Sequence, residues 1–117
     1  MDPSEPLQPR IEFSTFAACD LRVGRILSAS LLEGARRPAY VLDIDFGPLG
    51  RLKSTAQLVE DHNPEDLVDR KVVAVVNLPP KQVGHHQSRC LVLGALHAQH
   101  VGLLSVPDAT PLGTRIH

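Results

Sequence analysis

The most constraining feature of the chain is a strict alternation of side chains in the segment YVLDIDFG. Leu42, Ile44 and Phe46 fall on one side of an extended chain, and Asp43 and Asp45 fall on the other. This two-residue period is typical of a half-buried β-strand. The segment therefore predicts a sheet with one apolar face and one face toward solvent.

The residues that follow alternate in the same way after a turn, GPLG, at residues 47–50. One face carries Arg51, Lys53 and Thr55, and the other carries Leu52, Ser54 and Ala56. Because side chains alternate across a strand, the two segments predict a hairpin with two cations on its outer face.

Further strand-like runs and one helix complete the pattern. The phase of the alternation changes after Gly24, which predicts a strongly bent strand with a bulge. Asn63-Pro64 followed by two acids is typical of a helix start and predicts a short helix over about residues 64–69. Further strands are expected at residues 20–31, 72–76, 90–96 and 101–106.

Five or six short strands with turn-rich connections and one short helix between the third and fourth strands predict an all-β barrel. The position of the helix suits an oligonucleotide-binding (OB) barrel of Greek-key type, with terminal extensions. Residues 1–12 contain three of the ten prolines and predict an extended N-terminal arm. Residues 13–117 then form one domain, as the length of 117 residues allows.

The net charge of -1 excludes a chain that coats nucleic acid by its global charge, so a polyanion would have to be met locally. Five of the thirteen acids lie within residues 60–69, and the rest of the chain has eight acids against twelve Lys and Arg. One acidic patch could therefore conceal a basic face. Alternatively, these acids line the solvent side and first turn of the short helix.

The two cysteines lie far apart without a CxxC spacing, and the acidic, Pro-rich start lacks the pattern of a secretion signal. No apolar run approaches the length that crosses a bilayer. We expect a cytoplasmic protein with reduced thiols and no membrane insertion.

The chain contains side chains that could bind a metal ion or act in catalysis, but their spacing does not match a metal site or a catalytic motif. His85, His86, Cys90 and Asp108 are common ligand types, yet adjacent histidines on extended backbone point in opposite directions and no second pair has ligand spacing. Neither a GxSxG elbow nor a Gly-rich phosphate loop occurs. We therefore expect no enzyme, no metal and no cofactor.

The positions of the basic residues favour nucleic-acid binding over catalysis or metal binding. Six cations fall in a loop, on one strand face and in the segment NLPPKQVGHHQSRC, namely Arg36, Arg37, Arg51, Lys53, Lys81 and Arg89. A barrel could bring them together, although scattered solubilising charge is the alternative. Three Phe and one Tyr are too few for stacking successive bases, which favours a reader of folded RNA shape and backbone.

Five ordered motifs carry a family resemblance: FSTFAACDLRVGRILSA, EGARRPAYVLDIDFG, KSTAQL, DLVDRKVVAVVNLPPKQVG and SRCLVLGA. In order and spacing they resemble the CsaA family of small bacterial chaperone-like proteins, itself similar to the tRNA-binding domains appended to methionyl-tRNA synthetase. The likeness covers about residues 11–117. It implies an OB-fold homodimer, held partly by segments outside the barrel, that binds tRNA without catalysis.

Carried over by position, the resemblance implies eight RNA-contact residues: Arg36, Arg37, Lys53, Gln57, Asn77, Lys81, Ser88 and Leu91. Arg37 stands where the family has Lys, which keeps the charge and adds a bidentate phosphate donor. The last motif usually reads Ser-x-Gly-Met in synthetase domains. Here Cys90 and Leu91 occupy the Gly-Met positions.

Four polar residues of this region have structural alternatives. Asn77 could cap a strand end, and Ser88 could satisfy its own backbone. His85 and His86 would rim the site, or form an exposed loop tip. The resemblance also implies a second function, a protein-export chaperone that binds unfolded peptides or preproteins in an apolar groove and works with the secretion machinery. The sequence leaves both functions open.

Overall fold

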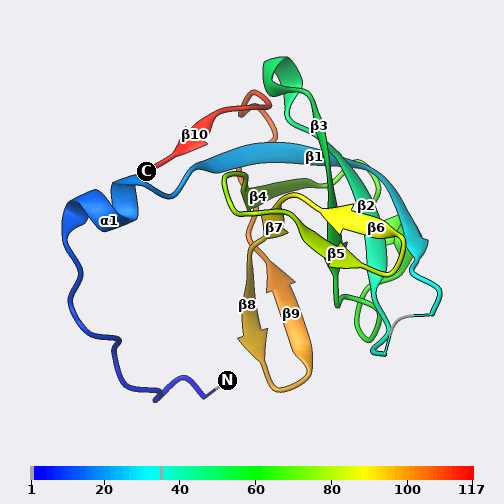
Figure 1. The fold of residues 1–117 in the computed structure, drawn as a ribbon, viewed down its shortest axis with the longest axis horizontal. Coiled ribbons are helices and arrows are strands. Elements are labelled where there is room, and N and C mark those ends of the chain that lie inside the picture. Colours follow the sequence, from blue (N-terminus) through cyan, green and yellow to red (C-terminus); the bar gives the residue numbers. More distant parts are fainter. Residues whose placement is uncertain (1, 35) are drawn as a thin grey trace.

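The computed structural model describes residues 2–34 and 36–117 (Figure 1). Met1 and Ala35, which the expected arm and domain include, lie outside the described residues. One antiparallel sheet, ordered β3-β2-β1-β4-β7 with β10 also paired to β1, curls into a nearly closed barrel. Its strands are β1 (Leu21–Leu31), β2 (Tyr40–Asp45), β3 (Arg51–Ala56), β4 (Lys71–Val75), β7 (Leu91–Val92) and β10 (Arg115–Ile116). The expected OB-like all-β barrel is confirmed.

Outside this sheet, the described residues form two hairpins and three short helices. The hairpins pair β5 (Lys81–Val83) with β6 (His86–Ser88), and β8 (Gly94–His97) with β9 (His100–Leu103). The helices are α1 (Phe13–Ala17), the 3-10 turn η1 (Gly47–Leu49) and α2 (Pro64–Leu67). Within the described ranges, none of these helices is long and apolar enough to span a bilayer.

The β2–β3 hairpin follows the alternation of its sequence. Leu42, Ile44 and Phe46 are buried in the main core, while Asp43 of β2 lies opposite Lys53 of β3 on the outer side. The turn between the strands is η1. The expected hairpin with outward cations is confirmed.

Strand β1 is bent, and Gly24 allows it to lie against the core. A Cβ atom at Gly24 would stand 2.5 Å from Cγ2 of Ile44 and 2.7 Å from Cε1 of Phe46. The register with β2 shifts between Ile26 and Ser28, so the bulge lies a few residues beyond the glycine that suggested it. The close approach at Gly24 and the bulge are thus separate features of the same strand.

The barrel closes between β3 and the residues just before β7. The N–H of Arg89 donates to the carbonyl oxygen of Lys53 at 2.8 Å, and the Cys90 thiol lies 3.7 Å from the same oxygen. Cys90 is buried, and this burial raises its pKa to about 12. Cys90, which stands at the glycine position of the Ser-x-Gly-Met motif of synthetase domains, therefore fills the seam of the barrel.

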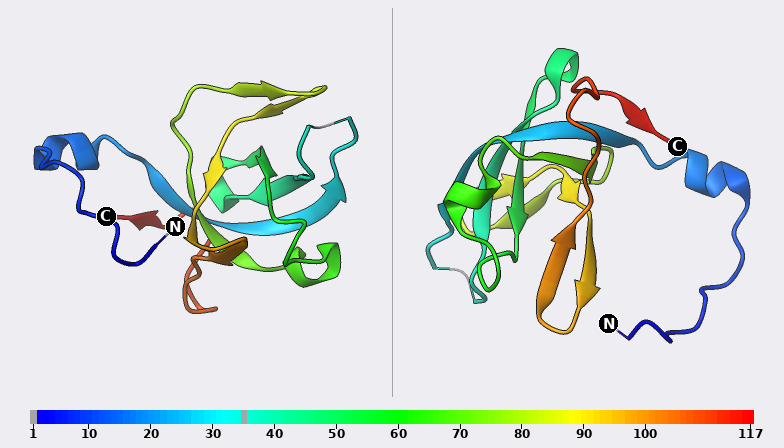
Figure 2. Two further views of the ribbon diagram at one scale, coloured as in Figure 1. Left: turned by 90° about the horizontal axis from the view of Figure 1, so that it is seen from below. Right: turned by 180° about the vertical axis from the view of Figure 1, so that it is seen from behind.

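Several elements differ from the sequence-based expectation. The loop expected after Pro79-Pro80 contains the β5–β6 hairpin, and the strand expected at residues 90–96 is divided into β7 and β8. Helix α1 was not expected, and α2 ends two residues earlier than predicted. Figure 2 shows α1 and the chain before it lying clear of the barrel, which explains why no core periodicity marks them.

Candidate nucleic-acid interface

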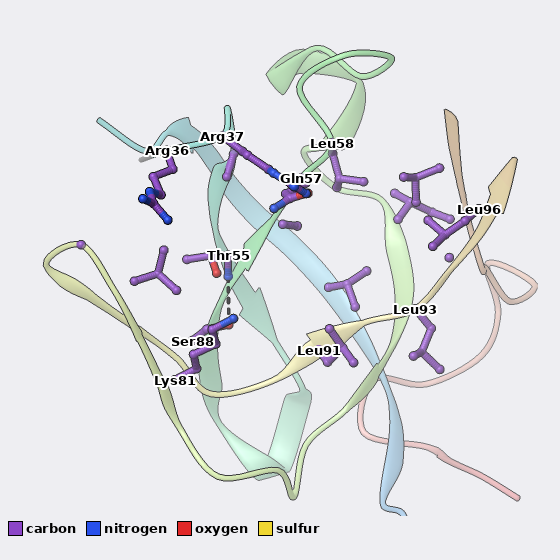
Figure 3. Close-up of a pocket in the computed structure, with 18 of the residues that line it drawn as sticks. Arg36, Arg37, Thr55, Gln57, Leu58, Lys81, Ser88, Leu91, Leu93 and Leu96 are labelled. Carbon is purple, nitrogen blue, oxygen red and sulfur yellow. Dashed lines mark hydrogen bonds between the residues drawn. The ribbon is translucent and has the colours of Figure 1, made fainter. Parts of the chain in front are cut away.

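An open groove of about 940 Å³ runs between the β5–β6 hairpin, the β1–β2 loop and the β8–β9 hairpin (Figure 3). Its polar part is lined by Arg36, Arg37, Gln57, Lys81 and Ser88. Its apolar part is lined by Leu58, Leu91, Leu93, Leu96 and Val101. Cations and leucines thus share one hollow on the side of the barrel.

Six of the eight residues carried over from the resemblance line this groove: Arg36, Arg37, Gln57, Lys81, Ser88 and Leu91. The two arginines come from the β1–β2 loop, and Lys81 and Ser88 come from the facing hairpin (Figure 3). These segments are separated by more than forty residues in the sequence. The barrel therefore brings distant cations to opposite walls of one groove.

Lys53 and Asn77 lie outside the groove. Lys53 is exposed on β3, two residues before the groove-lining Thr55 and therefore on the same face of the strand. The Asn77 side chain accepts the N–H of Asp20 at 2.8 Å and donates to the carbonyl oxygen of Ala18 at 2.7 Å. It thereby ties the end of α1 to the end of β4.

The β5–β6 hairpin is held in place by a small apolar contact and a tight turn. Val83 packs against the cluster formed by Leu32, Ala39 and Val41. Gly84 has a φ of +60°, which suits the first position of a two-residue hairpin turn. Packing of Val83 thus holds the Lys81 strand over the groove.

The two histidines of this hairpin lie in its turn and on one of its strands. His85 is exposed in the turn, and His86 is half-buried in β6. Within residues 2–34 and 36–117, no three His, Cys, Asp or Glu side chains gather in a way that could hold a metal ion.

The groove cations have no acidic partner in the described part of the chain. The Arg–carboxylate pairs there join Arg22 and Arg115 to Asp20. From the acidic cluster at residues 60–69, Asp61 accepts the Val101 N–H at 2.9 Å, and this bond holds the Asp61 pKa below its usual value. Among the residues that the structure describes, the ion pairs of this cluster join Asp61 to His62 and His100, and none joins the cluster to a groove cation.

The β8–β9 hairpin contributes residues that the sequence did not assign to a site. Leu96 and Val101 line the groove and also a second cavity of about 430 Å³ beside it, which shares Arg37 and Gln57. The hairpin is anchored by the Val101 carbonyl oxygen, 2.8 Å from Nε2 of His62. No sequence signal separates Leu96 from a core leucine, because its strand is only four residues long.

The chain is similar to proteins of known family and structure. Residues 21–115 match the family described as "Putative tRNA binding domain". This match covers most of the chain. Together with the barrel fold, it shows that the chain is a tRNA-binding domain protein. The chain is similar to the chaperone CsaA from Bacillus anthracis str. Ames, with 44% sequence identity and a TM-score of 0.87 to its crystal structure. The aligned part covers 93% of this chain and 100% of that chain. The CsaA chaperone protein from Picrophilus torridus is 39% identical with a TM-score of 0.86, covering 92% and 100%.

The chain belongs to the CsaA family of tRNA-binding domain proteins. The methionine–tRNA ligase of Thermococcus kodakarensis is 35% identical over 91% of this chain. The chain spans only 14% of that enzyme's length.

Proposed function

We propose that this protein is a non-catalytic tRNA-binding protein that holds folded RNA along the cationic groove. The observation that carries the proposal is the convergence of Arg36, Arg37 and Lys81 on one groove without carboxylate partners among the described residues. Membership of the tRNA-binding domain family supports the choice of RNA.

The chemistry of the groove suits phosphate. Each guanidinium of Arg36 and Arg37 offers paired N–H donors to two oxygens of one phosphate, and Lys81 adds a point charge from the opposite wall. Lys53 extends the cationic surface along β3. Each phosphate neutralised releases counterions, so the affinity falls steeply with salt, by about 0.7 to 0.9 in the log–log slope per contact.

We further propose that the protein acts as a homodimer, because α1 exposes apolar side chains outside the barrel. Phe13 is 77% exposed, and its ring centroid lies 6.2 Å from that of Phe16, which is itself partly exposed. Such side chains are enriched at interfaces between subunits. Two barrels joined there would offer folded RNA a wider surface than one barrel.

A second candidate function is the binding of unfolded protein segments, as a chaperone would. Leu91 and Leu96 line the groove and remain 49% and 48% exposed, which suits apolar side chains of an extended peptide. Unfolded preproteins and the secretion machinery would then be the partners. Binding through apolar contact should persist or strengthen at high salt, whereas RNA binding should weaken.

The experiment is a purification without nuclease at low and at high salt, followed by sizing of the bound RNA. Recovery of a discrete tRNA-sized band that is lost at high salt supports the first proposal. Absence of RNA, together with suppressed aggregation of an unfolded client at both salt concentrations, supports the second and contradicts the first.

A further inference from the structure

We infer that the groove binds unpaired nucleotides of a folded RNA. Phosphates lie on the walls that carry Arg36, Arg37 and Lys81, and a base lies on the leucine floor, which is formed by Leu91, Leu93 and Leu96. This inference rests on the proposed tRNA-binding function and specifies which part of the RNA enters the site. It adds a role for Leu96 and the β8–β9 hairpin, to which the resemblance assigns none.

The order of side chains along the groove carries the first step. Arg36 stands near one end, the Arg37 side chain reaches Gln57 in the middle, and Leu93 and Leu96 stand near the other end (Figure 3). A paired RNA helix presents phosphates and ribose at its surface and keeps its base faces stacked inside. It would use the cations and leave the leucine floor without a matching surface. An unpaired nucleotide has both an anionic phosphate and a flat apolar base.

The second cavity, beside the groove, provides room for a further part of the same RNA strand. It adjoins the groove, and the two share a wall formed by Arg37, Gln57, Leu96 and Val101. Glu60 also lines the second cavity, so the phosphates of a single strand fit the groove side of the wall and a second base of that strand fits the cavity beyond it. The Arg37 guanidinium can then contact the linking phosphate or lie flat on a base.

Gln57 supplies a group that can read a base edge. Its side-chain amide has both donors and an acceptor, and Gln57 is an exposed residue that lines both cavities. Unpaired bases in loops and ends of RNA expose their hydrogen-bonding edges. Gln57 therefore stands where such an edge would pass between the two cavities.

The lining also sets the strength of the interaction. No Phe, Tyr or Trp occurs among the described residues that line either cavity. Leucine and guanidinium faces take the place of aromatic rings, so each base adds a modest gain to a mainly electrostatic affinity.

The test is a competition for fluorescently labelled tRNA bound to the full chain at fixed salt. One competitor is an unstructured, uridine-rich RNA, and the other is a blunt-ended RNA duplex with the same number of phosphates. We expect the unpaired RNA to compete at about a fivefold lower concentration or better.

The matched variants are Leu96→Ala in the groove and Leu104→Ala outside both cavities, since the two leucines are 48% and 46% exposed. Leu96→Ala should weaken the unpaired competitor about fivefold and leave its salt slope and the duplex affinity unchanged. Leu104→Ala should match the unaltered protein. Circular dichroism checks that both variants remain folded.

Two results would overturn the inference while leaving the proposed function intact. One is equal competition by duplex and unpaired RNA; the other is identical RNA binding by the Leu96→Ala and Leu104→Ala variants, with Arg37→Ala still weakening tRNA. Loss of unfolded-client capture but not of RNA binding in Leu96→Ala would assign the floor to peptide instead. If tRNA does not bind at all, the proposed function fails and the inference fails with it.

Discussion

The hydroxyl oxygen of Ser88 accepts a hydrogen bond from the backbone N–H of Thr55 at 3.1 Å, which joins β6 to β3 on the wall of the groove. The same hydroxyl donates its proton to the carbonyl oxygen of Cys90 at 3.3 Å. The family resemblance places Ser88 among the RNA contacts, but both bonds are made within the protein. We propose that Ser88 positions the Lys81 hairpin instead of donating to phosphate.

Replacing Ser88 with Ala should lower the free energy of unfolding by about 1 kcal/mol or somewhat more, because the Thr55 N–H loses its partner. Urea unfolding measures this change, and amide hydrogen exchange at Thr55 should become faster. The salt slope of tRNA binding should not change, since no charge is removed. Ser30→Ala, at an exposed position of β1, is the control and should be nearly neutral. An unchanged stability with a reduced RNA affinity would assign Ser88 to RNA.

Gly24→Ala should destabilise the barrel by about 1 to 3 kcal/mol, because the new methyl group overlaps the Ile44 and Phe46 side chains. Gly102→Ala is the matched control, since its Cβ would meet no atom closer than 3.9 Å. Thermal and urea unfolding of both variants make the comparison. Equal stability of the two would show that β1 does not approach the core as closely as described.

Asn77→Ala should detach the end of α1 from β4, because two side-chain hydrogen bonds to Asp20 and Ala18 are lost. We expect a loss of about 1 to 3 kcal/mol in the free energy of unfolding and a lower dimer fraction in analytical ultracentrifugation. The salt slope of tRNA binding should stay the same. Asn63→Ala is the control, because among the described residues the one side-chain hydrogen bond of Asn63 is long, at 3.5 Å to Asp66. A reduced RNA affinity in a fully dimeric Asn77→Ala protein would contradict this assignment.

The two cysteines should differ in reactivity. Cys19 is exposed, whereas burial raises the pKa of Cys90 to about 12. The folded protein should therefore react with one equivalent of a thiol reagent at pH 8, and the unfolded protein with two. The folded state keeps the Cys90 proton above pH 9, where the unfolded state loses it, so this thiol makes the free energy of unfolding fall as pH rises from about 9 to 12. Rapid labelling of both thiols in the folded protein would show that the seam is open.

The sequence predicted those parts of the fold in which local pattern and burial agree. The β2–β3 hairpin was predicted because Leu42 and Ile44 alternate with acids and the buried side is continuous. The β5–β6 hairpin was not, because Lys81 and Gln82 carry no strand signal and the hairpin depends on Val83 reaching a distant apolar cluster. Long-range packing of this kind has no periodicity in the sequence.

The sequence likewise predicted some residues of the candidate site and not others. The cations at Arg36, Arg37 and Lys81 could be named from motifs, and the structure places them around one groove. Asn77 could not be separated from them by motif alone, since its partners lie 57 and 59 residues away. Leu96 was missed because its role depends on where a short hairpin folds relative to the barrel.

The most direct test of the central claim is the salt dependence of tRNA affinity for the unaltered protein and for Arg37→Ala, with Arg10→Ala in the N-terminal segment as a control of equal charge change. We predict that Arg37→Ala weakens binding at low salt and reduces the log–log slope by about 0.7 to 0.9, while Arg10→Ala changes neither quantity. Identical affinities and slopes for all three proteins would contradict the account of a cationic RNA-binding groove.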